Sequence, residues 1–255
     1  MQNLKKLSFV IILSATIFVA CSGDDNGDTD ETIDPIATDY DITSILNKFN
    51  GTGLSYEVNG NTVTFTTEGV PNHTSPYWPT NNPLYEAYNG TNTNFQLNPN
   101  TISSQNIVFT ITLNPAEATT HAATGLGPIG ISRNGVAFYN QYAGPDEPLT
   151  NEIDSFDQWL GHPQMSGQYH YHIEPTYLTD QFGDDAFLGL LADGFPVYGP
   201  IENGNEITNA DLDEYHGHNE PTADFPDGIY HYHITSEDPY LNGNGYYGTA
   251  GNISN

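Results

Sequence analysis

Alternating apolar and polar positions predict that most of this chain folds as β-strands. Val63, Phe65 and Thr67 are separated by threonines, and every second residue over 107–113 is Ile, Phe or Leu. Alternation with a period of two is typical of a strand with one buried face. We therefore expect two half-buried strands here, joined by a long ordered loop over residues 71–106, which is rich in Asn, Pro, Thr and Tyr.

One segment has helical spacing instead. Asp41 is a candidate N-cap, and the positions that would share one helical face are Ile42, Ile45, Leu46 and Phe49. Gly51 lies just beyond the last of them. This pattern predicts one short amphipathic helix before the strands.

A block that predicts a hairpin occurs twice. Residues 130–139 are echoed by residues 189–198, with Asn-Gly in the first copy and Asp-Gly in the second. These dipeptides favour two-residue turns in which both residues have positive φ. Pro196 removes a backbone donor, so we expect its strand to lie at a sheet edge.

Two further blocks recur in the same order. Residues 156–162 match 212–218, and residues 166–173 match 227–234. The blocks predict an internal duplication, with one repeat over about 126–175 and the other over about 185–236. Each repeat is too small for a core of its own. We therefore expect a single, mainly β domain over residues 41–255, with few short helices.

The beginning of the chain has the pattern of a bacterial lipoprotein signal. Two lysines precede an apolar run over residues 7–20 that is short for a membrane span, and the run ends at Cys21. We expect a signal peptide over residues 1–20, lipid on Cys21 and an acidic flexible tether over residues 21–40. An ordinary cleaved signal and an uncleaved anchor are the alternatives. This interpretation predicts an extracytoplasmic protein, lipid-anchored at the outer membrane or cell surface of a Gram-negative bacterium.

Composition narrows the functional classes. The 255 residues carry 32 acidic and 4 basic side chains, and the formal net charge is −28. Such an acidic chain lacks the positive surface of a nucleic-acid binder, so no nucleic-acid partner is expected. The membrane is the one partner predicted, through the lipid. A single cysteine excludes an internal disulfide framework and any site with several thiolates.

The nine histidines are the candidate chemistry of the chain. His170 and His172 share one face of a strand, as do His231 and His233, because alternate strand residues point the same way. A Gly-His step before each strand would add His162 to the first pair and His218 to the second. We predict that these six histidines converge on a divalent metal near the axis between the repeats. Six imidazoles exceed what most single sites use, so some should orient ligands or bind a second metal. Without thiolates, the donors favour copper, zinc, iron or manganese.

Other residues near these blocks are candidates for extra ligands or for groups that orient the imidazoles. They are His73, His216, Asp157, Asp213 and Glu214. Capping a turn is an equally open role for the carboxylates, and Asp193 is expected to be a turn residue only. His121 is expected to lie outside the site. Histidines that only hydrogen-bond within a sheet remain the alternative to metal binding.

The repeated blocks resemble the YHYH domain family of secreted and surface proteins. The resemblance rests on the two Tyr-His-Tyr-His strands, on residues 193–200 and 212–218, and on Gly-Pro-Ile-Gly at 127–130. It extends over roughly residues 60–250 and implies a β-rich domain. The family often has cysteine before the Gly-His steps, whereas this chain has Trp159-Leu160 and Tyr215-His216 there. No thiol role is therefore carried over.

Three functional classes remain open at this point. The first is a surface protein with a metal-binding domain, which we favour. The second is a metal-dependent extracytoplasmic enzyme that uses copper, iron or zinc, and the third is a structural or adhesive domain without metal. The sequence identifies no catalytic residue and no substrate.

Overall fold

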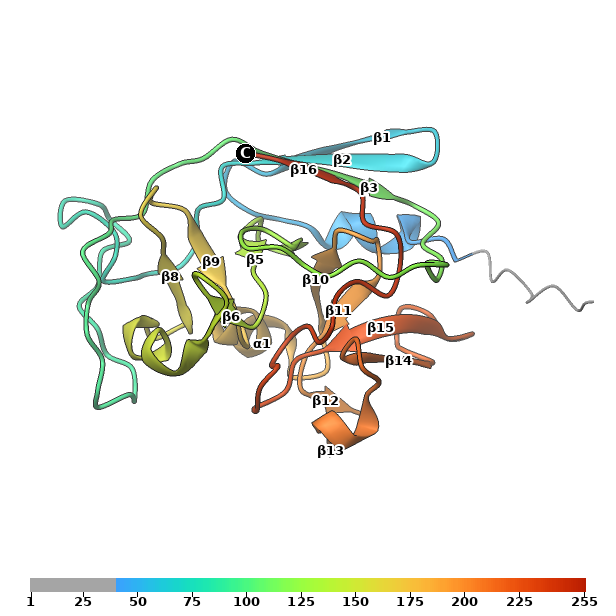
Figure 1. Cartoon of the computed structure of the whole chain (residues 1–255). Helices are drawn as coiled ribbons and strands as arrows, with labels where there is room; N and C mark the ends of the chain where they lie inside the picture. Colours follow the sequence, from blue (N-terminus) through green and yellow to red (C-terminus); the bar gives the residue numbers. More distant parts are fainter. Residues whose placement is uncertain (1–39) are drawn as a thin grey trace, which may run out of the picture. The chain divides into compact units, whose positions relative to one another are not determined.

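The computed structural model describes residues 40–255, which Figure 1 shows in colour. The predicted signal peptide, Cys21 and all but the last residue of the predicted tether lie outside this range. Within it, no helix is long and apolar enough to cross a membrane. The described part is mainly β with short helices, as the alternating pattern predicts.

A four-stranded antiparallel sheet forms from the segments with the clearest alternation. Its order is β1-β2-β3-β16, with bounds Ser55–Asn59, Thr62–Thr67, Ile107–Thr112 and Asn252–Ser254. Phe65 lies opposite Phe109 in the register, and both are fully buried. Their neighbours Thr64 and Thr110 are only half-buried. The two predicted half-buried strands are therefore confirmed.

The predicted helix after Asp41 forms as a 3₁₀ helix, η1 (Thr43–Lys48). The Asp41 carboxylate accepts a hydrogen bond from the Thr43 N–H at 2.8 Å. Ile45 and Leu46 are buried on the inner side of η1, which explains the apolar spacing. The buried side chains of η1 pack with buried side chains of both sheets, and together they form one continuous core.

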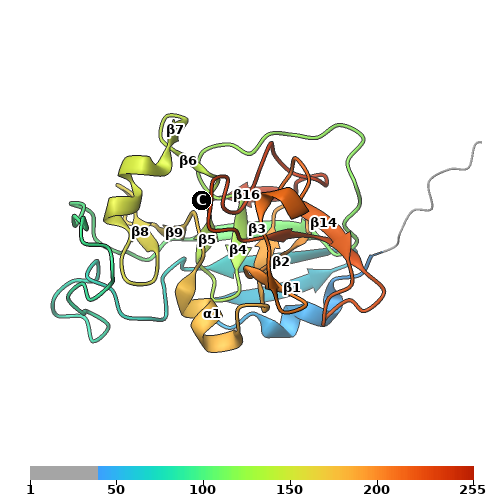
Figure 2. The same ribbon diagram turned by 90° about the horizontal axis from the view of Figure 1, so that it is seen from below.

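The second sheet has eight strands and contains all the repeated blocks (Figures 1 and 2). Its order is β14-β15-β11-β10-β4-β5-β9-β8. The bounds are β4 Gly130–Ser132, β5 Ala137–Phe138, β8 Gly161–Pro163, β9 Tyr169–Tyr171, β10 Phe187–Leu191, β11 Pro196–Tyr198, β14 Gly217–Glu220 and β15 Ile229–His233. The remaining elements are β6 Tyr142–Ala143, β7 Glu147–Pro148, β12 Ile201–Glu202, β13 Asn205–Glu206, η2 Leu149–Asn151, η3 Ile153–Ser155, η4 Asn209–Asp211 and α1 Thr176–Phe182.

The pairing pattern of this sheet reads the same from either edge. Each edge is an antiparallel pair, β8 with β9 and β14 with β15. The inner strand of each pair runs parallel to its next neighbour, β9 to β5 and β15 to β11. Antiparallel pairing of β4 with β10 closes the centre. This arrangement is what two equivalent repeats would produce, whereas a common ancestry of the two halves stays a prediction.

The two repeated hairpins differ from the predicted turn type. Gly135 and Gly194 have φ of 87° and 91°, whereas Asn134 and Asp193 are not among the residues with positive φ. The Gly135 N–H donates to Ser132 O, and the Gly194 N–H donates to Leu191 O. Each turn therefore has one left-handed residue, a glycine, rather than two. The prediction of two-residue turns with two positive φ values is wrong.

The edge position predicted from Pro196 is also wrong. Strand β11 lies between β15 and β10, inside the sheet. Pro196 is its first residue and pairs with Leu190 of β10, whereas pairing with β15 begins only at Val197. A proline at the first position of a strand leaves no ladder donor missing, so an interior strand tolerates it here.

The predicted long loop over residues 71–106 packs against the β8–β9 edge of the sheet. The Ser75 hydroxyl donates to the Asp157 carboxylate, and the Tyr77 hydroxyl donates to Ser155 O. Asn98 and Asn100 both donate to Pro163 O, at 3.1 and 3.0 Å. The loop thus covers the β8–β9 edge of the sheet. The second set of repeated blocks has no corresponding loop for the β14–β15 edge.

The glycine of each Gly-His step lies against a tyrosine of the neighbouring strand. A Cβ on Gly161 would come within 2.5 Å of the Tyr169 hydroxyl oxygen, and one on Gly217 within 2.4 Å of the Tyr230 hydroxyl oxygen. Such separations are shorter than any real Cβ contact, so the space admits only glycine.

We therefore predict that Gly217→Ala lowers the free energy of unfolding by about 1–3 kcal/mol, because the added methyl group displaces the Tyr230 ring or the strand. Urea unfolding of the two proteins measures the difference. The control is Gly125→Ala, since an added Cβ there meets nothing within 4 Å, and it should change stability by less than about 0.5 kcal/mol. Equal losses in both variants would contradict the packing argument.

Candidate metal centres

Strand alternation separates the histidines from the tyrosines. In β9, His170 lies between Tyr169 and Tyr171, and β15 has the same arrangement around His231. The tyrosine hydroxyls of these strands bond buried polar groups on one face, such as the Asp157 carboxylate. The histidines point to the opposite face, where an antiparallel neighbour places one more imidazole beside them.

The third imidazole of each group comes from the edge strand. His162 of β8 lies directly opposite His170 of β9, and His218 of β14 lies directly opposite His231 of β15. Directly opposed residues on one face are the closest side-chain neighbours in an antiparallel sheet. The predicted Gly-His contribution to each histidine pair is therefore present in the structure.

The first group is the β8–β9 cluster, defined as His162, His170 and His172. The Nε2 atom of His170 lies 3.1 Å from Nε2 of His162 and 3.0 Å from Nε2 of His172. All three residues are 2% exposed. One carboxylate approaches them: Glu152 Oε1 is 3.5 Å from His162 Nε2.

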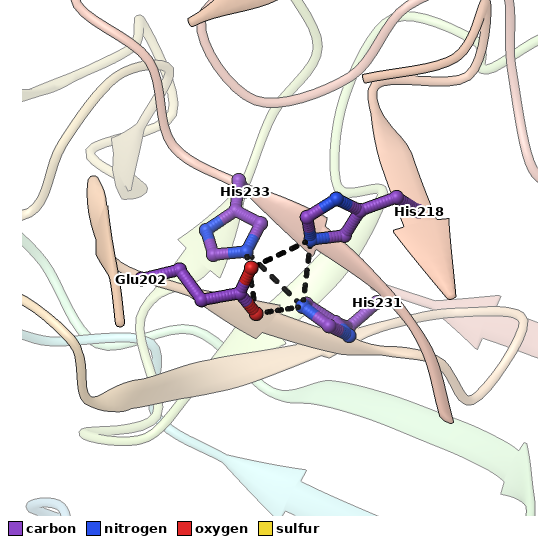
Figure 3. A group of neighbouring side chains, drawn as sticks. All are labelled: Glu202, His218, His231 and His233. Carbon is purple, nitrogen blue, oxygen red and sulfur yellow. Dashed lines mark hydrogen bonds and ion pairs between the residues drawn. The ribbon is translucent and has the colours of Figure 1, made fainter. Parts of the chain in front are cut away.

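The second group is the β14–β15 cluster, defined as Glu202, His218, His231 and His233 (Figure 3). His231 Nε2 lies 3.2 Å from His218 Nε2 and 3.1 Å from His233 Nε2. The Glu202 carboxylate faces all three rings, with distances of 3.2 Å to His231, 3.4 Å to His218 and 3.8 Å to His233.

The six predicted ligands thus form two groups, and the prediction that they converge on one axis is wrong. Strands β9 and β15 are separated by β5, β4, β10 and β11. Five strand spacings of about 4.8 Å place the groups roughly 24 Å apart. The centre of the sheet is occupied instead by the β4–β10 pair, which carries no histidine.

The hydrogen bonds of the Nδ1 atoms show which ring nitrogen of these histidines is available to a ligand. His172 Nδ1 lies 2.5 Å from Asn140 O, and His233 Nδ1 lies 2.7 Å from Gly199 O. A carbonyl oxygen only accepts hydrogen bonds, so Nδ1 carries the proton and Nε2 presents a lone pair. His170 and His231 make the same contact with backbone carbonyls two residues earlier in their strands.

The Nδ1 atom of His162 has two side-chain neighbours. It lies 2.7 Å from the Ser155 hydroxyl oxygen, and that hydroxyl donates its own hydrogen to Glu152 O. It also lies 3.5 Å from the Asn98 amide nitrogen, which only donates. His162 Nδ1 thus faces one acceptor and one donor, and the Nε2 lone pairs that carbonyl contacts fix in the β8–β9 cluster are those of His170 and His172.

Burial keeps five of the cluster imidazoles uncharged at neutral pH. Burial lowers the pKa of His172, His231 and His233 to about 4 and that of His162 to about 3. The pKa of His170 is also far below its usual value for the same reason. A neutral imidazole with a free Nε2 is the form that ligates metal ions.

The spacing of the Nε2 atoms fits a metal ion. Ligands at about 2.05 Å from a tetrahedral ion lie about 3.3 Å apart, and neighbouring ligands of an octahedral ion lie about 2.9 Å apart. The separations of 3.0–3.2 Å within both clusters fall between these values. Both groups are therefore close enough to hold a metal ion.

Two carboxylates of these sites lie outside the repeated blocks, so the sequence did not identify them. Glu202 ends β12, and Glu152 caps η2. The Glu152 side chain is 30% exposed, yet its Oε2 atom is buried without a hydrogen-bond partner among the described residues. Burial raises the pKa of Glu152 as well. A bound cation would satisfy this oxygen.

Asp157 and Asp213, predicted as ligands, orienting groups or turn caps, are turn caps. Asp157 accepts hydrogen bonds from the N–H groups of Trp159 and Gly161, and Asp213 does the same for Tyr215 and Gly217. Each also accepts the hydroxyl of a strand tyrosine, on the face away from the histidines. Neither carboxylate belongs to a cluster.

The other candidates lie outside both clusters. His73 Nε2 contacts the Tyr171 hydroxyl at 2.9 Å, and His216 Nε2 contacts the Thr235 hydroxyl at 3.0 Å. The Glu214 carboxylate accepts a hydrogen bond from the Asn244 amide. His121 is likewise outside, as expected. Asp193 is more than a turn residue, because it is fully buried and accepts the Tyr232 hydroxyl.

The β14–β15 cluster opens into a cavity of about 460 Å³. Glu202 and His233 line it together with Tyr198, whose hydroxyl bonds Thr222 and Asp224 at 3.0 Å each. The cluster thus combines side chains that could hold a metal ion with room for a small molecule.

A comparison with protein-family models found a match that covers the eight-stranded sheet. The family model described as YHYH protein matches residues 108–208 and 201–245, which include both clusters. The searches of curated proteins and of solved structures found no match.

The neutral buried histidines predict a pH dependence of the metal-free protein. Seven histidines have a pKa lowered by burial: His73, His162, His170, His172, His216, His231 and His233. In the unfolded chain they take up protons near pH 6.5, whereas most of the folded values lie near 4. Their contribution to stability is therefore complete above pH 6.5 and is lost as the pH falls toward 4.

Buried carboxyls act in the opposite direction, since burial raises the pKa of Asp157 and Asp193 to about 6 and also raises that of Glu152 and Glu174. The seven histidines outnumber them. We expect the free energy of unfolding, measured by urea titration in chelator, to fall by at least about 3 kcal/mol between pH 7 and pH 5. A flat profile over this range would mean that the rings are protonated without unfolding.

Proposed function

Since the chain belongs to the YHYH protein family, we propose that its shared sheet binds two divalent transition-metal ions, one in each histidine cluster. The observation that carries this proposal is the convergence of Nε2 atoms at 3.0–3.2 Å in both clusters, while backbone carbonyls hold the Nδ1 atoms of His170, His172, His231 and His233. Facing lone pairs repel one another unless a cation lies between them.

The alternative without metal has a specific difficulty. A hydrogen bond between two imidazoles requires one Nε2 to carry a proton, but the backbone carbonyls already take the Nδ1 protons of His170 and His172. A second proton would charge the ring, and burial lowers the pKa of both. A metal ion resolves this conflict without placing a proton in the cluster.

The donor set narrows the choice of metal. Three imidazole nitrogens with one carboxylate suit zinc, copper, iron or manganese, whereas calcium and magnesium prefer oxygen ligands. Glu202 in one cluster and Glu152 in the other each supply one negative charge. The chain carries a net charge of −28, which attracts cations.

We predict that the full chain, purified without a histidine tag and loaded with zinc, holds two equivalents. His172→Ala and His233→Ala should each lose one equivalent and the corresponding zinc-dependent gain in stability, about 2.7 kcal/mol at a hundredfold excess over the dissociation constant. Elemental analysis and thermal unfolding measure these effects. The matched control His121→Ala removes a histidine outside both clusters and should keep both equivalents.

If the wild-type chain takes up no zinc, copper, iron or manganese, and chelator leaves its melting temperature unchanged, the histidines are structural. The chain would then be a structural or adhesive surface domain.

We also propose that the domain works outside the cytoplasm, tethered to the outer membrane or cell surface by lipid on Cys21. The apolar run that ends at this cysteine supports the proposal. Cys21→Ser should abolish acyl labelling in cells and move the chain from the detergent phase to the aqueous phase. A wild-type chain without an acyl group would refute the anchor and leave the metal sites unaffected.

A second candidate function is that of a metal-dependent enzyme. The cavity beside the β14–β15 cluster favours it, since a catalytic metal needs an accessible coordination position. Metal binding alone stays the primary proposal, because two histidine clusters support it, whereas the cavity adjoins only one of them.

A further inference from the structure

The two clusters have similar histidine and glutamate side chains, but different residues pack around them. In the β8–β9 cluster, the Phe156 ring meets His162 edge-on at 4.8 Å and lies parallel to His172 at 5.9 Å. Tyr139 stacks on His170 at 3.9 Å. The long loop adds the Asn98 amide, 3.5 Å from His162 Nδ1. The three imidazoles of this cluster are therefore enclosed by protein.

The β14–β15 cluster has less of this cover, although Tyr198 meets His231 edge-on at 5.2 Å. The residue that corresponds to Phe156 in the repeated block is Leu212, which is only half-buried and has no aromatic ring. The side chain of His218 is 18% exposed, against 3% for His162, whereas the carboxylates differ the other way, with Glu202 14% and Glu152 30% exposed. The cavity of about 460 Å³ begins at Glu202 and His233.

We infer that the metal of the β14–β15 cluster has an exchangeable coordination position for a small uncharged ligand, whereas the metal of the β8–β9 cluster is closed and structural. This inference rests on the proposed function, because it assigns different roles to the two proposed metals. Structural sites fill all positions with protein ligands, while reactive sites leave one for water or substrate.

The charges of the cavity indicate the class of ligand. Two carboxylates line it, Glu202 and Asp185, and its lining includes no lysine or arginine. They balance the two positive charges of a divalent metal, so the cavity offers no surplus positive charge to an anion. The strongly negative chain repels anions further. An uncharged polar molecule that supplies one donor atom fits these conditions.

The two sites can be tested separately in copper-loaded full-length chains. His172→Ala retains only the β14–β15 cluster, and His233→Ala retains only the β8–β9 cluster. Adding nicotinamide, whose ring nitrogen can ligate copper, should change the copper paramagnetic resonance spectrum of the His172→Ala variant alone.

Two further experiments test the role of the cavity and the charge of the ligand. Ala223 lines the cavity without belonging to the cluster, so Ala223→Trp should block nicotinamide and keep the copper, whereas Ala123→Trp, outside the cavity, should change neither. Nicotinate has the same shape and a negative charge. We expect it to bind at least about fivefold more weakly than nicotinamide.

The outcomes distinguish a failure of the proposed metal binding from a failure of the inference about the exchangeable position. If neither single-cluster variant holds copper, the proposed function fails. If both hold copper but nicotinamide perturbs both or neither, the inference is overturned and metal binding stands. Equal or tighter binding of nicotinate would overturn the assignment of an uncharged ligand.

Discussion

One aspartate in each half of the large sheet, the buried Asp157 and the exposed Asp213, bonds a strand tyrosine and the loop that precedes the neighbouring strand. Both Asp157 oxygens lie 2.9 Å from the Tyr169 hydroxyl, and Asp157 also accepts the N–H groups of Trp159 and Gly161. Tyr169 adjoins one cluster histidine and Gly161 adjoins another. The carboxylate therefore sets the separation of the two imidazoles from the opposite face of the sheet. Such a buried group is stable only because it is bonded several times.

This arrangement fixes the imidazoles before any ligand arrives. Burying neutral rings with facing lone pairs costs free energy, which a metal ion would recover if it bound there, because the side chains need no rearrangement. Gly161 and Gly217 belong to the same device, since the tyrosine that bonds the carboxylate occupies the space of their missing Cβ atoms. The repeated tyrosines and glycines thus fix how the paired strands fit together on one face of the sheet. The same strands carry the histidines on the other face.

Much of this geometry follows from local spacing, which explains what could be predicted. Alternation places His170 with His172, and a hairpin brings His162 opposite. The number of sites could not be predicted, because it depends on strand order across the whole sheet. Glu152 and Glu202 were missed for a similar reason: each lies outside the repeated blocks, and only the folded chain brings it near the rings. The turns and Pro196 differ from prediction because tertiary pairing overrides local preference.

The differences between the two halves lie in the cover rather than in the ligands. Both keep three histidines in the same register, with the same contacts of Nδ1 to backbone carbonyls in β9 and β15. What changes is Phe156 against Leu212, and a long loop at one edge against a cavity at the other. A fold that repeats a rigid histidine-bearing face can therefore vary solvent access at each copy independently, because access is set by segments outside the sheet.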